Sequence, residues 1–170
     1  MTPWLLSLTA ALALSAASCG GGATYDGARY RADDLAFRAG PVPPGWRRLE
    51  TSHGRLAFRD DASAATVIVN GRCGKDGDDT PLEALTNHLF LQFTEREVES
   101  EETVPFDGRE ARRTVLTAKL DGVKMRFMAV VLKKDGCVYD LVLMSEPGSF
   151  AAARGPFERF VATFSGEGHP

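Results

Sequence analysis

The stretch Asp121–Met144, DGVKMRFMAVVLKKDGCVYDLVLM, decides how this chain folds. It contains two Asp-Gly pairs, at 121–122 and 135–136, and a third pair stands at 107–108. Asp-Gly between strand-like runs is a strong hairpin signal, because both residues tolerate the positive φ that a tight turn needs. The pattern predicts a four-stranded antiparallel meander with strands at about 96–104, 109–120, 123–133 and 137–145.

The central strands of this meander are apolar on both faces. In the strand 123–133 the odd-numbered residues from Val123 to Val131 form one apolar face. The opposite face begins with Lys124 and Arg126 and continues as Met128, Val130 and Leu132. An antiparallel sheet with one face in water would instead alternate between apolar and polar residues. Other parts of the chain must therefore cover both faces of the sheet.

Two segments have the helical spacing that such covers need. Over 81–93 the apolar residues recur in a 3-4-4 pattern, as Leu82, Leu85, Leu89 and Phe93. Near the C-terminus a second run, interrupted at Gly155-Pro156, contains Phe150, Phe157, Phe160, Val161 and Phe164. We expect an α+β fold in which helices cover both faces of an antiparallel sheet, a three-layer α/β/α sandwich.

The first of these helices carries a start signal. Thr80 stands at the predicted N-cap, Pro81 suits the first helical position, and Glu83 completes a capping box. The acidic residues over 76–79 could alternatively bind calcium, but their spacing does not match an EF-hand loop. We favour the interpretation in which they face the positive end of the helix.

The order of elements adds a resemblance to a known family. Short strands are expected near 35–37, 45–49, 55–59 and 64–70, ahead of the helix and the meander. With the segments VPPGW (42–46), TPLEAL (80–85) and FERFVATF (157–164), this order resembles the PsbP-like fold. That fold is shared by PsbP of photosystem II, a Ran-binding import factor, DcrB-type bacterial lipoproteins and type VI effector chaperones. The resemblance covers a single domain over 33–165, and it implies binding to protein surfaces and carries no catalytic residue.

The N-terminal segment resembles a bacterial lipoprotein signal. Residues 1–18 contain no charged side chain, and Ala16-Ala17-Ser18 leads directly into Cys19, whose thiol could take a diacylglycerol. The alternatives are a buried N-terminal helix or a plain secretory signal with a chance cysteine. The lipoprotein interpretation makes 1–18 a signal peptide and 19–32 a lipidated cysteine with a flexible tether. By the family's sorting pattern, Gly20 favours the outer membrane over the inner one.

The cysteine count is consistent with export to an oxidising compartment. If Cys19 carries lipid, Cys73 and Cys137 remain, and an even remainder favours a disulfide over two free buried thiols. Neither cysteine has a CxxC partner, and the three histidines fall at no metal-ligand spacing, so we expect no metal and no cofactor. The last residues, 166–170, are expected to form a disordered tail.

The remaining residues favour binding over catalysis. The formal net charge of −3 argues against nucleic acid as a partner, and no common hydrolase, zincin or P-loop motif occurs. Glutamates alternate with other residues over 95–102, which is typical of a solvated edge strand. Lys119 and Lys124 flank a predicted turn, and with Arg126 and Trp46 they form our candidate partner surface.

Three hypotheses about function follow. The first is a non-enzymatic, lipid-anchored protein-binding or assembly module of the bacterial cell envelope. The second is an envelope lipoprotein that binds a small molecule or an ion near Trp46 or the acidic loop. The third is a hydrolase with a cryptic site around His53 or His88.

Overall fold

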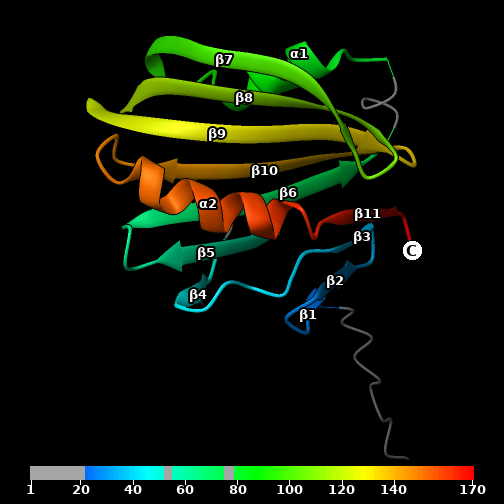
Figure 1. The fold of residues 1–170 in the computed structure, drawn as a ribbon. Helices are drawn as coiled ribbons and strands as arrows, with labels where there is room; N and C mark the ends of the chain where they lie inside the picture. Colours follow the sequence, from blue (N-terminus) through cyan, green and yellow to red (C-terminus); the bar gives the residue numbers. More distant parts are fainter. Residues whose placement is uncertain (1–21, 52–54, 75–78) are drawn as a thin grey trace, which may run out of the picture.

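A computed structural model describes residues 22–51, 55–74 and 79–170, and a seven-stranded antiparallel sheet forms its centre (Figure 1). From one edge to the other its strands are β4 (Trp46–Leu49), β5 (Leu56–Asp60), β6 (Ala65–Cys73), β10 (Cys137–Ser145), β9 (Val123–Lys134), β8 (Arg109–Leu120) and β7 (Thr94–Phe106). The strands β7, β8, β9 and β10 follow one another in the chain and pair in that order. They are the predicted four-stranded meander, so that prediction is confirmed.

The three Asp-Gly pairs form the turns of this meander. Asp121 has φ 49° and Gly122 has φ 82°, and the flanking residues Leu120 and Val123 pair directly. The turns at Asp107 and Asp135 have the same two-residue form with positive φ. Positive φ at both central residues is the turn that matches the twist of a hairpin, which explains why Asp-Gly fixes the register here.

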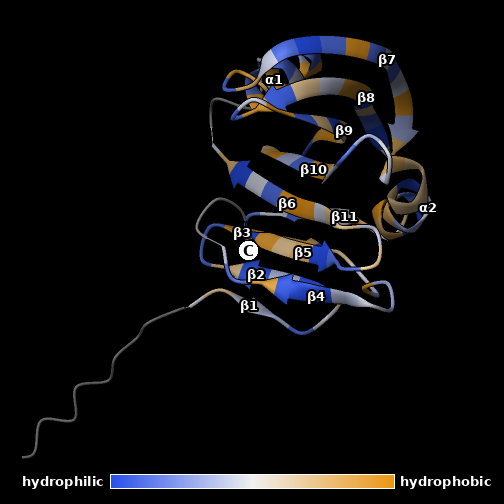
Figure 2. Cartoon of the chain, turned by 90° about the vertical axis from the view of Figure 1, so that its left-hand side faces the viewer, coloured by the Kyte–Doolittle hydropathy of each residue, from blue (hydrophilic) through white to orange (hydrophobic). Residues whose placement is uncertain are grey.

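The two helices lie on opposite faces of the large sheet, as expected (Figure 2). α1 (Leu82–Leu89) packs on β8 and β9, whereas α2 (Phe150–Val161) packs on β10, β6 and β9. A second, four-stranded sheet shares the α2 face, with strands β1 (Thr24–Tyr25), β2 (Arg29–Ala32), β3 (Leu35–Arg38) and β11 (Ser165–Gly168). The three-layer α+β architecture is therefore confirmed, with one outer layer made of a helix and a small sheet.

The main core lies on the α2 face and is aromatic. Phe37 of the small sheet meets Tyr139 of β10 with ring centroids 6.3 Å apart, and Phe164 contacts both rings. Gly166 allows this close packing, because a Cβ there would lie 2.5 Å from the Tyr139 ring. On the α1 face a smaller cluster joins Phe90 and Phe127, whose centroids are 5.4 Å apart.

Two segments predicted from sequence to be tether and tail form strands instead. Residues 24–25 and 29–32, expected to be tether, form β1 and β2, and residues 166–168, expected to belong to a disordered tail, form part of β11 (Ser165–Gly168). β11 pairs with β3, and the Gly168 amide donates to the Tyr139 hydroxyl at 2.8 Å. Because these partners are distant in sequence, no local sequence pattern predicts β11.

The helix ends and the helix interruption also differ from prediction. Pro81 is the N-cap of α1, not its first helical residue, and no side-chain cap hydrogen bond forms. The helix also ends at Leu89, four residues short of the predicted end. α2 is continuous through Pro156, although proline removes one helical donor. Burial of Phe150, Phe157 and Phe160 against the sheet outweighs that loss.

Candidate functional site

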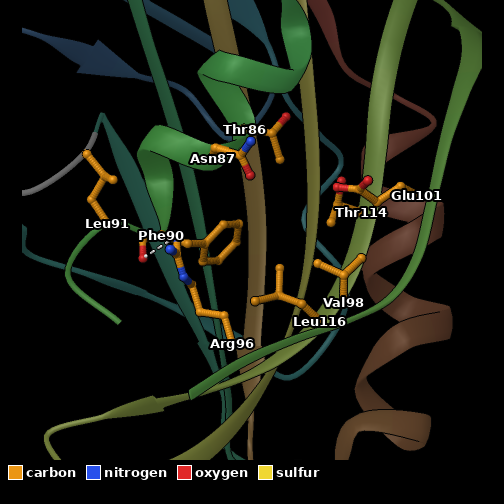
Figure 3. A pocket seen from close by; sticks show the side chains of 9 residues that line it. All are labelled: Thr86, Asn87, Phe90, Leu91, Arg96, Val98, Glu101, Thr114 and Leu116. Atoms are coloured by element: carbon orange, nitrogen blue, oxygen red, sulfur yellow. Dashed lines mark hydrogen bonds between the residues drawn. The ribbon is translucent and has the colours of Figure 1, made fainter. Parts of the chain in front are cut away.

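A groove of about 450 Å³ separates α1 from the edge strand β7 (Figure 3). Its residues come from three elements, and they are Thr86, Asn87, Phe90 and Leu91 from α1 and its C-terminal turn, Arg96, Val98 and Glu101 from β7, and Thr114 and Leu116 from β8. We call this feature the α1–β7 groove. One wall is therefore helical, the other is an extended edge, and β8 forms the floor.

The path of β7 shapes this groove. Register shifts interrupt its pairing with β8 between Thr94 and Glu97 and again between Val98 and Ser100. Such bulges bend a strand and increase its twist. Arg96 then reaches α1, where its guanidinium Nη1 donates to the Phe90 carbonyl at 3.3 Å (Figure 3). This bond ties the edge strand to the C-terminal turn of the helix and closes one end of the groove.

The rim of the groove exposes apolar surface. In the part of the chain that the structure describes, three large hydrophobic side chains are exposed, and two of them, Leu91 at 64% and Val98 at 57%, line this groove. The third, Val123, lies in a hairpin at 56% exposure. Apolar side chains that gather around a concave site, with polar groups beside them, are typical of a binding surface.

The floor of the groove contains an unsatisfied polar atom. Thr114 is 1% exposed, and its Oγ1 has no hydrogen-bond partner among the described residues. Beside it, Glu101 accepts a hydrogen bond from Arg112 Nη2 at 2.6 Å, while Arg112 Nε is also without a partner. Buried polar groups are almost always paired, so Thr114 Oγ1, which belongs to a lining residue of the groove, marks a place where a ligand could supply a partner.

The predicted partner surface is not one surface. Trp46 is half-buried on β4, at the far edge of the sheet, where its ring lies 5.4 Å from that of Phe160. Lys119 and Lys124 lie opposite each other across the β8–β9 turn, as a two-residue loop requires. Because β6, β10 and other strands separate the two places, the structure does not bring Trp46 to the basic residues.

The basic residues are paired with the acidic edge strand. Lys119 Nζ lies 2.7 Å from Glu95, and Lys124 Nζ lies 3.9 Å from Glu97. Arg126 binds Glu99 and also stacks over the Phe150 ring of α2 at 4.4 Å. The exposed glutamates of β7 therefore balance these cations, and the basic hairpin tip predicted from sequence is largely neutralised.

Two of the three cysteines are bonded to each other in the structure. Cys73 and Cys137 form a disulfide between the paired ends of β6 and β10, which bears out the predicted pairing. Cys19 and His53 lie outside the described residues, and His88 is exposed on α1. Within the described ranges no three His, Cys, Asp or Glu side chains are grouped as metal ligands, and neither helix is long and apolar enough to span a bilayer.

The sequence offered two weak signals for the α1–β7 groove. Val98 is an apolar residue within the run of glutamates over 95–102, where a purely solvated edge would have no reason to carry it. Leu91 lies off the apolar stripe predicted for the first helix. Neither residue indicates a groove alone, because the groove exists only where the bent β7 passes α1.

Several solved structures have a similar fold, at low sequence identity. No protein-family model and no curated protein matches the chain. CyanoP, the cyanobacterial PsbP of Synechocystis sp. PCC 6803, matches with a TM-score of 0.55 at 16% identity, over 88% of this chain and 97% of that chain. LpqN of Mycobacterium tuberculosis, described as involved in cell envelope biogenesis, matches with a TM-score of 0.53 at 16% identity, over 76% and 82%.

A eukaryotic protein has the same architecture. The Ran-binding protein Mog1p of Saccharomyces cerevisiae matches with a TM-score of 0.55 at 14% identity, over 82% of this chain and 90% of that chain. At these identities the likeness concerns the fold. The chain has the α+β fold of PsbP and Mog1p, as the order of elements in the sequence predicted.

Proposed function

We propose that this protein is a non-enzymatic, membrane-anchored module of the bacterial cell envelope that binds a partner protein in the α1–β7 groove. The observation that carries the proposal is the exposed apolar rim of Leu91 and Val98 above the unpartnered Thr114 Oγ1. The involvement of LpqN in cell envelope biogenesis and the Ran binding of Mog1p support the same class of role.

The groove favours an extended segment of the partner. β7 is the edge strand of the sheet, so an extended segment of a partner can enter the groove along it, between β7 and α1 and over β8. An apolar side chain of that segment would cover Leu91 and Val98. A hydroxyl or amide group would reach Thr114 Oγ1 and the Asn87 side chain on the opposite wall. The partner therefore combines one apolar anchor with a central hydrogen-bonding group.

The proposed anchor holds the β1 end of the fold close to the membrane, whereas the groove beside β7 lies at the opposite end (Figure 1). Lipid on Cys19 would be separated from β1, which begins at Thr24, by only four residues. An extended chain spans at most about 3.6 Å per residue, so the body would lie within roughly 18 Å of the lipidated residue. Two or three acyl chains suffice for stable anchoring. Because Gly20 follows the cysteine, we propose the outer membrane as the destination.

Surface variants test the groove. We predict that L91D combined with V98D lowers, by at least tenfold, the yield of the partner that is crosslinked to the full chain in its native envelope. The matched control is V123D, which places the same charge on the third exposed apolar residue, outside the groove. An adduct that survives in L91D/V98D as well as in V123D would contradict the proposal.

The mass of the native protein tests the anchor. After extraction from its membrane, the chain should begin at an acylated Cys19, and a C19A variant should lose membrane attachment. A full-length mass beginning at Met1, without lipid, would contradict the anchor and leave the groove proposal standing.

A small-molecule role is the second candidate. A hollow of about 310 Å³ lies beside Trp46, lined in part by Asp60 and Pro156. Asp60 already accepts hydrogen bonds from Ala62 N and from Ser63 Oγ, so its carboxylate is satisfied within the fold. This hollow is therefore a weaker candidate than the groove.

A further inference from the structure

A second pocket, of about 400 Å³, lies on the same face of the sheet as α1 but on the other side of that helix. β6, β9 and β10 form its floor, with Asn70, Phe127 and Asp140 among the lining residues, and Gln92 and Phe93 approach from the turn after α1. Its volume lies within the range of small-molecule sites. Phe90 contributes to both this pocket and the α1–β7 groove.

Asp140 is the unexplained residue of this pocket. It is 4% exposed at the centre of β10, and its Oδ1 accepts no hydrogen bond from the described residues. The nearest cation is Arg72, whose Nη1 lies 3.8 Å from that oxygen, beyond hydrogen-bond distance, on a half-exposed side chain. A buried carboxylate without a charge-assisted hydrogen bond is costly, and Asp140 is one of the residues that line this pocket.

The walls around Asp140 suit a cation on an apolar body. The rings of Phe93 and Phe127 meet edge to face with centroids 4.9 Å apart, and Val142 adds aliphatic surface. Aromatic faces attract ammonium and guanidinium groups. The side-chain amides of Asn70 and Gln92 each carry an oxygen that can accept from such a donor.

We propose that this pocket binds a protonated amine or guanidinium carried on an apolar body, with Asp140 as its counter-charge. The cation would replace the missing hydrogen-bond donor at Oδ1, and the apolar body would lie against Phe93 and Phe127. This site is separate from the proposed partner groove and does not depend on it. A free amine and a basic side chain of another protein share this chemistry.

Calorimetry with the full chain tests the proposal, using 2-phenylethylamine and its uncharged match 2-phenylethanol. We expect saturable binding of the amine and at least tenfold weaker binding of the alcohol. In NMR spectra the amine should change the chemical shifts of the methyl groups of Val142 and Met144. D140N should weaken amine binding at least tenfold. The control E146Q, at an exposed carboxylate between β10 and α2, should leave it unchanged.

A second arm identifies the source of the cation. A short apolar peptide with one lysine is compared with the same peptide acetylated at that lysine. Preference for the free lysine, without amine binding, would assign the pocket to a basic side chain, whereas amine binding assigns it to a small ligand. The proposal is overturned if neither probe binds, or if each probe binds as well as its uncharged match. The amine–alcohol comparison needs no variant, so the test holds even if D140N fails to fold.

Discussion

At the scale of single residues, Asp140 should make stability depend on pH. Burial raises the pKa of its carboxyl from 3.8 to about 6, and the Arg72 guanidinium offsets this only in part. The pKa is higher in the folded than in the unfolded chain, so protonated Asp140 contributes favourably to the free energy of unfolding. This contribution is complete below pH 3.8 and is lost as pH rises through 6. Two pKa units correspond to about 3 kcal/mol.

The variant D140N lacks this titration. We predict that its free energy of unfolding, relative to the unsubstituted chain, rises by about 3 kcal/mol between pH 4 and pH 8. Urea denaturation of both proteins across that range measures the difference, in which other titrating groups cancel. A difference that is constant with pH would mean that Asp140 does not ionise within the folded state at a raised pKa.

Gly166 should tolerate no side chain. A Cβ at this position would lie 2.5 Å from Tyr139 Cε2, a ring atom held in the core by Phe37 and Phe164. Overpacking of this kind costs about 1–3 kcal/mol, so G166A should lower the free energy of unfolding by that amount. Gly148 is the control, because nothing lies within 4 Å of a Cβ there. Equal effects of G166A and G148A on denaturation would refute this account of the close contact.

At the scale of elements, the turn between β7 and β8 holds the C-terminal strand. Asp107 Oδ2 accepts a hydrogen bond from the Gly166 amide at 2.8 Å and from Lys134 Nζ at 2.9 Å, and Oδ1 accepts from Ser165 Oγ. The Asp107 side chain therefore connects β11 both to the β7–β8 turn and, through Lys134, to β9.

The variant D107N separates this role from the turn itself. Asparagine tolerates the positive φ of 48°, but it replaces one acceptor oxygen with a donor, so we expect a loss of about 1–2 kcal/mol. D121N makes the same change at the matching position of the next turn, where the side chain is exposed, and should change stability little. Faster amide exchange of β11 in D107N alone would locate the effect, and equal exchange in both variants would contradict it.

The same elements show what sequence could predict. The meander was predictable because each Asp-Gly turn is local and both neighbouring strands carry the period-two pattern. β1, β2 and β11 were missed because their order depends on distant partners, such as Tyr139 for Gly168. The α1–β7 groove was missed for a related reason, since it depends on bulges in β7 and on where α1 lies, and neither is encoded by spacing alone.

At the scale of the whole molecule, one covalent bond joins the first half of the chain to the second. Cys73 and Cys137 are 64 residues apart, and they close the β6–β10 ladder at its last pair. Closing a loop of this length stabilises a fold by about 2–4 kcal/mol. C73S/C137S should lose that much stability, and dithiothreitol should lower the unsubstituted chain to the same level. No change in either experiment would mean that the two thiols are not bonded in the native protein.

In the intact envelope, the α1–β7 groove is the surface that we propose meets a partner protein. The most direct test places a photocrosslinking amino acid at Asn87 in the groove or at exposed Arg154 on α2, on the opposite face, and irradiates intact cells. Position 87 should give one discrete adduct that L91D/V98D abolishes, and position 154 should give none of that mass. The same adduct from both positions, or none from position 87, would contradict it.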